Sequence, residues 1–456
     1  MGSVLPDAEY LVLASRLIPD LDGGFTIAVL RRARDMAAAG ARVGVLTLDP
    51  GTTEDHDEHR AEWRRRGLLP DGVELHNLFD DVRTDSAWLR EAALPLEKAE
   101  TSAPAERRVI SDAAGRTVLE LPVIHADPSW HLSEAPVIVW DADGPAGWLP
   151  GFGALYRAWL NTLSAAATAV PVVVCEARQV GELLVADAAV LLDPAVIMIH
   201  ATHACHVQGP YKWDSPMDAI WTRWLEVADR FDGVLWLTPS QQRDVERRVG
   251  DGIRSAVVPH PVPATGANHP VPGRLVMMCS LIARKRVDHA IRAFAKIRSV
   301  MPALQLHVYG GGGLRGELDQ LSADLGVADD VILHGHVSDL TQAWHEADVF
   351  VLTSANEGQG LVVLEALGHG VPVVSYDMPY GPGDMLVGGG GILVPDGDED
   401  ALAVALTDAI GDRERREVLA AQARDVAATM SPAASMSALG AAVRTAIGAP
   451  AVRPGR

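Results

Sequence analysis

Short apolar strands alternate with helical stretches in two separate series along this 456-residue chain, and this alternation constrains its fold most strongly. In the first series, an apolar segment at residues 10–14 is followed by a loop with Gly23 and Gly24, a helical pattern and a second apolar segment at 42–48. A second series with the same order begins near residue 274. Continuous apolar strands joined by helices are typical of parallel sheets that are covered on both faces. The pattern predicts an α/β fold with two doubly wound, Rossmann-like domains facing a cleft.

Changes in this rhythm predict the domain boundaries. Proline and glycine are concentrated at residues 261–273, which indicates a linker between an N-terminal domain, 1–265, and a C-terminal domain, 266–430. Residues 431–456 are predicted to form a helix that packs back on the first domain, followed by a tail. Short β-like pieces separated by turn signals lie at about 73–160 and predict an antiparallel insert in the first domain. The first of these pieces is a strand predicted at residues 73–77. Exposed edges of such an insert could mediate homo-oligomer formation.

The charge and cysteine content exclude several classes of protein. Lys and Arg total 39 against 60 Asp and Glu, a net charge of −21, which disfavours binding to nucleic acid or to anionic membranes. Three cysteines do not make a disulfide framework and favour a reducing compartment. The N-terminus lacks the basic and apolar regions of a signal peptide, and no apolar run is long enough to predict a transmembrane segment. We therefore expect a cytoplasmic protein that holds any anionic ligand with local positive groups.

The most informative segment runs from a predicted strand at residues 349–353 into a helix beginning near Gly360. Glu357 lies in the loop between them, and Glu365 lies one turn beyond Leu361 on the same helix face. The amides at a helix N-terminus suit a diphosphate, and a carboxylate on an apolar helix suits the hydroxyls of a ribose. On spacing alone, Glu357 could equally be a solvated loop residue and Glu365 a member of a buried ion pair.

These residues also carry a family resemblance. Glu357, Gly360 and Glu365, together with the sequence at 370–377 and Lys285, resemble the retaining GT-B glycosyltransferases of family GT4. The resemblance is greatest to the bacterial branch that contains wall teichoic acid and serine-rich adhesin α-glycosyltransferases. It is specific over residues 274–410 and weak over the insert.

The resemblance implies roles for individual residues. Glu365 would hold the nucleotide ribose, and Glu357 would contact donor sugar hydroxyls beside the anomeric carbon. The amides of Gly360 and Leu361 would meet the sugar or diphosphate. Lys285 would neutralise the diphosphate leaving group, which lowers the barrier because negative charge develops on the phosphate oxygens as the bond breaks.

One position departs from the family pattern. The family usually has an Arg five residues before the lysine, where this chain has Ser280. Either Arg284 substitutes for it in donor binding, or donor binding is weakened and Arg284 is a surface residue beside Lys285.

Two glycine-containing loops are further candidates for donor binding. Gly310 and Gly311 follow a predicted strand and would let the chain pass close to the nucleotide, although a glycine run alone indicates only a flexible turn. Gly23 and Gly24 resemble the family's acceptor-side glycine loop, which approaches the donor phosphates. The alternative for them is a tight strand-to-helix turn.

Residues 200–206 contain three histidines and a cysteine, but no second cluster completes a tetrahedral zinc site, so we predict no metal here. Related sequences carry a histidine near the acceptor and donor sugar at this place. His203 is the first candidate for that catalytic role and His206 the second, with core or loop histidines as the alternative. Tyr211 and Trp213 are candidates for contact with the acceptor, because aromatic faces stack on sugars, although Trp more often lies in a core.

These expectations combine into one function. The chain would be a metal-independent, retaining hexosyltransferase that moves a sugar from a nucleotide sugar, expected to be UDP-linked, to a hydroxyl acceptor. The acceptor could be a cell-wall polymer, a protein Ser or Thr, or a natural product. No cofactor is implied besides the nucleotide sugar as co-substrate. The alternative, favoured by Ser280, is a non-catalytic GT-B partner that presents acceptors to an active glycosyltransferase.

Overall fold

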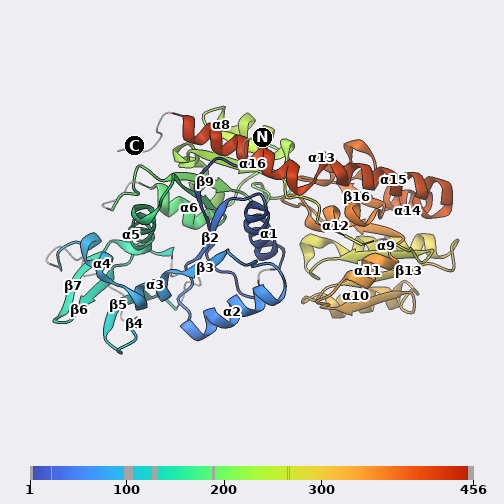
Figure 1. Ribbon diagram of the computed structural model, residues 1–456. Coiled ribbons are helices and arrows are strands. Elements are labelled where there is room, and N and C mark those ends of the chain that lie inside the picture. Colours follow the sequence, from blue (N-terminus) through green and yellow to red (C-terminus); the bar gives the residue numbers. More distant parts are fainter. Residues whose placement is uncertain are drawn as a thin grey trace.

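The computed structural model of the chain forms two lobes (Figure 1). One contains a seven-stranded parallel sheet and a four-stranded antiparallel sheet, and the other contains a six-stranded parallel sheet. The described residues are 4–21, 23–96, 106–125, 132–186, 190–263, 265–266 and 268–449. Residues 450–456, at the end of the predicted tail, lie outside these ranges.

The seven-stranded sheet has the order β11-β10-β9-β8-β1-β2-β3, and all its pairs are parallel. Every residue of β8 and β9 is buried, because apolar clusters cover both faces of the sheet. Its strands are β1 Glu9–Leu13, β2 Arg42–Thr47, β3 Glu74–Asn77, β8 Pro171–Cys175, β9 Ile197–Ala201, β10 Gly233–Trp236 and β11 Ser255–Val257. The helices of this lobe are α1 Gly24–Ala38, α2 Thr53–Arg65, α3 Leu78–Thr84, α4 Ala87–Ala92, α5 Gly151–Ala166, α6 Arg178–Val185, α7 Ala219–Glu226 and α8 Pro239–Val249, with the 3-10 turn Ala228–Arg230.

The antiparallel sheet has the order β4-β5-β6-β7 and lies within the predicted insert. Its strands are β4 Glu106–Ser111, β5 Thr117–Val123, β6 Val137–Asp141 and β7 Gly144–Leu149. The prediction that the first strand of the insert belongs to the antiparallel sheet is wrong. That strand is β3, which pairs in parallel with β2 and belongs to the seven-stranded sheet. The physical reason is that α2 crosses over between these strands and returns the chain in the same direction, as in a βαβ unit.

The second lobe is built on the sheet order β14-β13-β12-β15-β16-β17, which is also entirely parallel. The chain order reverses between β12 and β15, so the loops after these two strands open a crevice at the carboxyl edge. The strands are β12 Arg274–Met278, β13 Gln305–Tyr309, β14 Val331–Gly335, β15 Val349–Leu352, β16 Val373–Asp377 and β17 Gly391–Pro395. The helices are α9 Val287–Arg298, α10 Arg315–Asp324, α11 Thr341–Glu346, α12 Leu361–His369, α13 Pro382–Met385 and α14 Glu399–Gly411, with 3-10 turns at Ala283–Lys285 and Leu386–Gly388.

Two further helices connect the lobes. Helix α15, Arg413–Thr429, packs against α12, and α16, Pro432–Gly448, crosses the first lobe and packs on β9, β10 and β11 (Figure 1). The stretch Arg413–Gly448 is long and apolar enough to cross a membrane by composition alone. It is nevertheless divided at Pro432, and apolar side chains of its second half, such as Leu439 and Val443, are buried in the core of the first lobe. About a third of the most apolar window, 33%, is buried inside the protein.

Candidate functional site

A hollow of about 390 Å³ lies between the two lobes, where the carboxyl edges of both parallel sheets meet. Loops that follow β1, β9 and β10 form its first wall, and loops that follow β12 and β15 form the second. The lining residues are Gly24, Phe25, Ala28, His203, Leu237, His260, Met278, Cys279, Ser280, Arg284, Lys285, Glu357, Gly358, Gln359, Gly360, Leu361 and Val362. A larger hollow, about 580 Å³, lies on the second lobe and contains none of the predicted site residues.

Lys285 and Glu357 meet in the hollow. The Lys285 Nζ donates to Glu357 Oε1 at 2.5 Å, and both side chains are mostly buried. The Thr353 hydroxyl, at the end of β15, donates to the Lys285 carbonyl oxygen at 2.9 Å, which ties the Ala283–Lys285 turn to this strand. Lys285 and Glu357 are 72 positions apart in the chain, and both were predicted as site residues from the sequence. The structure brings them together.

Arg284 and Ser280 lie in the same wall. Arg284 Nη1 donates to the Asn356 carbonyl oxygen at 2.9 Å and lies 3.7 Å from Glu357 Oε2, with 41% of its side chain exposed. Ser280 is exposed and lines the hollow where the family pattern has an arginine. Arg284 is thus near enough to Glu357 to add positive charge to this wall.

Helix α12 begins at the hollow. Gly360 precedes it with a φ of 92°, a left-handed conformation that favours glycine, and Leu361 is its first residue. A Cβ atom added at Gly358 would overlap the His203 carbonyl oxygen of the opposite lobe. A Cβ at Gly24 would lie 3.4 Å from Leu361 Cδ1. The glycine loops therefore allow the lobes to approach closely beside the first amides of α12.

Glu365 is not among the residues that line the hollow. Its Oε1 lies 3.4 Å from both terminal nitrogens of Arg31, which projects from α1 in the opposite lobe. Burial raises the pKa of Glu365, and Arg31 acts against this shift. In this structure Glu365 is thus an ion-pair member, one of the two alternatives that the sequence left open.

The predicted histidines occupy different surroundings. His203 lines the hollow, and its Nε2 lies 2.5 Å from Oε2 of the buried Glu176. His206 is buried outside the hollow and stacks on Tyr380 with ring centroids 5.8 Å apart. Burial lowers the pKa of His206 to about 4, so this ring is neutral at physiological pH. The geometry favours His203 over His206 as the side chain available to a ligand in the hollow.

The predicted acceptor residues lie elsewhere, in the loop between β9 and α7. Trp213 is 38% exposed, and the Arg247 guanidinium lies 4.2 Å from its ring centroid. Tyr211 adopts a φ of 61° in the same loop. Neither residue is among those that line the hollow.

The remaining predicted glycines lie outside the lining of the hollow. Gly310 and Gly311 do not line the hollow, but a Cβ at Gly310 would overlap the Cys279 carbonyl oxygen, and the Gly311 carbonyl accepts from the Leu281 amide at 2.9 Å. Gly310 and Gly311 therefore contact the segment that carries Ser280 on both sides of that residue, and they do not form a flexible turn. Gly23 is the N-cap of α1, with a φ of 50°.

Gln359 is a site residue whose role the sequence did not reveal. Its side chain is buried, its Oε1 accepts from the His260 amide at 2.9 Å, and its Nε2 donates to the His260 carbonyl at 3.3 Å. It thereby joins the α12 loop to the segment that leads from the first lobe to the second. Its partner His260 is 99 positions away in the chain, and such a pairing is not visible in sequence.

Comparison with known proteins identifies the second lobe. The family described as "Glycosyl transferases group 1" matches residues 270–426. An exopolysaccharide phosphotransferase of Streptomyces coelicolor is 35% identical over 190 residues, which are 41% of this chain and 20% of that protein. The GtfA subunit of a UDP-N-acetylglucosamine–peptide N-acetylglucosaminyltransferase of Streptococcus pneumoniae is 31% identical over 125 residues, 27% of this chain and 25% of that protein. The chain thus spans a quarter or less of these two relatives.

The fold likeness extends over nearly the whole chain. The structure of S. aureus TarM, solved as a mutant in complex with Fondaparinux, α-GlcNAc-glycerol and UDP, superposes with a TM-score of 0.73 and is 15% identical. The superposition covers 97% of this chain and 100% of that one. The neighbouring folds confirm the α/β, GT-B prediction. Residues 270–426 thus match the glycosyl transferases group 1 family, and the chain has the GT-B fold.

Proposed function

We propose that this chain is a retaining, metal-independent hexosyltransferase that moves a sugar from a UDP-sugar to a hydroxyl of a polymer or protein. The observation that carries the proposal is the meeting of Lys285 and Glu357, 2.5 Å apart, beside the start of α12 in the interlobe hollow. Two fold neighbours support the choice of donor, since the TarM structure is a complex that contains UDP and the structure of the pneumococcal O-GlcNAc transferase GtfA is a complex with UDP and GlcNAc.

The residues in the hollow suit the departure of a diphosphate. Negative charge develops on the phosphate oxygens as the anomeric C–O bond breaks, and the Lys285 ammonium stabilises it. The free amides and partial positive charge at the start of α12 act in the same direction. Glu357 accepts hydrogen bonds from hydroxyls of the donor sugar. Glu365 accepts hydrogen bonds from the ribose hydroxyls once the nucleotide has displaced Arg31.

Retention follows from attack on the face from which the diphosphate leaves. The acceptor oxygen bonds to the anomeric carbon, the electron pair of the broken C–O bond goes to the diphosphate, and the acceptor proton goes to a leaving phosphate oxygen. Metal independence is part of the proposal because Lys285 supplies the positive charge that a divalent cation would supply. Retention is checked by the anomeric configuration of the product, and metal independence by turnover in EDTA.

The decisive experiment measures UDP release from a panel of UDP-, GDP- and dTDP-sugars with glycerol-phosphate polymer, ribitol-phosphate polymer and serine-rich peptide acceptors. We expect turnover with a UDP-sugar and its loss in Lys285→Ala and Glu357→Ala. Lys296→Ala, which removes a surface lysine paired with Asp400, is the matched control and should retain wild-type turnover. Hydrolysis or transfer that is indifferent to Lys285 would contradict the proposal.

A non-catalytic acceptor-presenting partner is the second candidate, because Ser280 replaces the arginine of the family pattern in the wall of the hollow. A precedent for paired chains is the structure described as a GtfA/B complex. Glycosylation that requires a second glycosyltransferase and is unaffected by Lys285→Ala would favour this candidate.

We further propose that the insert mediates association with a second copy. Strand β4 is at the end of the four-stranded sheet, and Val109 on it is 51% exposed. Light scattering of wild type and Val109→Lys tests this, with a monomer expected only for the variant. The use of a nucleotide sugar agrees with the cytoplasmic location expected from the sequence.

A further inference from the structure

Glu176 is a buried carboxylate directly behind the hollow. It follows the last residue of β8, its amide donates to the Leu13 carbonyl oxygen at 2.8 Å, and its side chain has no exposed surface. A carboxylate without solvent is costly unless cations and hydrogen-bond donors surround it. Its partners therefore decide what it does.

Arg32 supplies the cation. Its Nε lies 2.7 Å from Glu176 Oε1, and the arginine side chain is only 2% exposed. Arg32 is on α1 with Phe25 and Ala28, which line the hollow, at a spacing that places the three residues on one helix face. Burial acts to raise the pKa of Glu176, but Arg32 and His203 outweigh it, so the pKa is lowered and the side chain is ionised.

The second carboxylate oxygen contacts His203. Glu176 Oε2 lies 2.5 Å from His203 Nε2. The imidazole ring is held between Phe25, edge-on with centroids 5.0 Å apart, and His260, stacked with centroids 5.4 Å apart. An ionised carboxylate can only accept, so His203 Nε2 carries the proton of this bond, and Nδ1 is the remaining polar atom of the ring.

The backbone of His203 is positioned independently. Its carbonyl oxygen abuts Gly358, in the loop between Glu357 and the start of α12. This contact sets the distance between His203 and the donor side of the hollow, whereas the bond to Glu176 sets the rotation and tautomer of the ring.

We propose that Glu176, oriented by Arg32, is a positioning residue that keeps the proton of His203 on Nε2, so that Nδ1 faces the hollow as the acceptor for a sugar or acceptor hydroxyl. The hydroxyl contact rests on the proposed function, whereas the tautomer does not. A neutral His203 with the opposite tautomer would present a donor in place of an acceptor, and a hydroxyl that donates to Nδ1 would lose its partner.

Glu176→Gln separates this role from packing, since the two side chains have nearly the same shape. Arg32 needs an acceptor, so it takes the amide oxygen of Gln and leaves the amide NH₂ facing His203. The ring must then accept at Nε2 and carry its proton on Nδ1. The matched control is Glu182→Gln on α6, which removes the negative charge from the surface pair of Glu182 Oε1 with Arg223 Nε, 2.8 Å apart.

The direct test is long-range ¹H–¹⁵N NMR of histidine-labelled full-length protein, at a pH well above the ordinary histidine pKa of about 6.5. His203→Gln identifies the signals of this ring. We expect a protonated Nε2 in wild type and Glu182→Gln, and a protonated Nδ1 in Glu176→Gln. A wild-type ring protonated on Nδ1 would overturn the proposal without any Glu176 variant, and so would a Glu176→Gln ring that keeps its proton on Nε2.

Kinetics test the consequence for transfer. In Glu176→Gln we expect kcat to fall at least about tenfold, as for other residues that orient a functional ring, with UDP affinity within about twofold of wild type. Arg32→Met should lower kcat in the same direction, and Arg32→Lys should restore part of it. Unchanged kcat in a folded Glu176→Gln protein with the altered tautomer would refute the hydroxyl contact. If wild type transfers no sugar, the proposed function fails while the NMR result still decides the positioning.

Discussion

Arg31 of the first lobe and Glu365 of the second form an ion pair across the crevice, with Arg31 Nη1 and Nη2 each 3.4 Å from Glu365 Oε1. The two residues are 334 positions apart in the chain. The carboxylate proposed to hold a ribose is therefore engaged by the opposite lobe, and a nucleotide bound there would have to displace Arg31.

The first prediction concerns this carboxylate. Glu365→Gln should weaken UDP binding by about tenfold or more, because a hydrogen bond from a hydroxyl to a charged acceptor contributes about 1.5–3 kcal/mol. Calorimetric titration with UDP and with 2′-deoxy-UDP measures the effect. The wild type should discriminate between the two nucleotides and the variant should not, so equal discrimination by both proteins would exclude Glu365 from ribose binding.

The second prediction concerns the position that departs from the family pattern. Ser280→Arg should tighten UDP binding several-fold, because it adds a cation to the wall that holds Lys285, in a protein with a net charge of −21. UDP binding is then measured for Arg284→Ala alone and for the double variant that also carries Ser280→Arg. The comparison tests whether Arg284 substitutes for the missing arginine. If it does, Arg284→Ala weakens UDP binding more in the native background than beside Arg at position 280.

The third prediction uses the contact between the lobes. Gly358→Ala should reduce turnover at least about tenfold with little change in the thermal midpoint, because the new methyl group overlaps the His203 carbonyl oxygen and moves the two walls of the hollow apart. Gly316→Ala on α10 is the control, since a Cβ there meets nothing within 4 Å. Full activity of Gly358→Ala would mean that the walls can separate without harm to catalysis.

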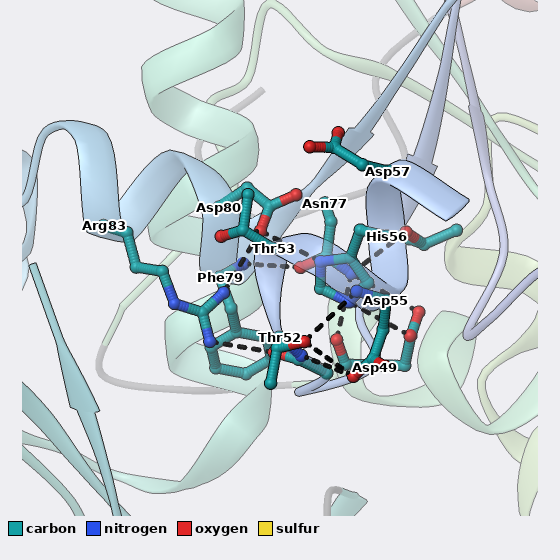
Figure 2. Close-up of polar contacts among 12 residues, drawn as sticks. Asp49, Thr52, Thr53, Asp55, His56, Asp57, Asn77, Phe79, Asp80 and Arg83 are labelled. Atoms are coloured by element: carbon teal, nitrogen blue, oxygen red, sulfur yellow. Dashed lines mark hydrogen bonds and ion pairs between the residues drawn. The ribbon is translucent and has the colours of Figure 1, made fainter. Parts of the chain in front are cut away.

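The fourth prediction concerns a buried histidine at the start of α2. His56 Nδ1 lies 2.9 Å from Asp80 Oδ1, and Nε2 lies 3.3 Å from Asp49 Oδ2, as Figure 2 shows for the network that joins the ends of β2 and β3. Burial acts to lower the pKa of His56, but the bonds to Asp49 and Asp80 outweigh it and raise the pKa to about 9. Charged His56 therefore stabilises the folded state.

Because the folded pKa lies above the unfolded value of about 6.5, this stabilisation is complete below about pH 6.5 and is lost as the pH rises through about 9. The free energy of unfolding should fall by about 1–3 kcal/mol over this interval, measured by urea denaturation. His56→Gln should be less stable at the acidic end and show a flatter pH dependence, whereas His59→Gln on the same helix should follow wild type. A wild-type stability that rises with pH over this interval would contradict the assignment.

Local pattern was sufficient for much of the architecture and for part of the site. Alternating strands and helices predicted both parallel sheets and the cleft between them, because burial on both faces imposes a continuous apolar sequence on each strand. Glu357 and Gly360 were predicted because they lie between a strand and the start of a helix, whereas Lys285 was predicted only through the family resemblance. The direction of β3 was missed, since a short strand has the same appearance in a parallel or an antiparallel pair.

The sequence by itself determined which residue types stand at the ends of strands and the starts of helices, because strand and helix periodicity depend on neighbours within a few positions. Only the tertiary structure decided that Glu365 pairs with Arg31, that Glu176 pairs with Arg32 and bonds to His203, and that Gln359 bonds to His260. The reason is that a buried charged or polar group is stabilised by whichever partner the packing brings within hydrogen-bond distance, and these partners come from separate segments or opposite lobes.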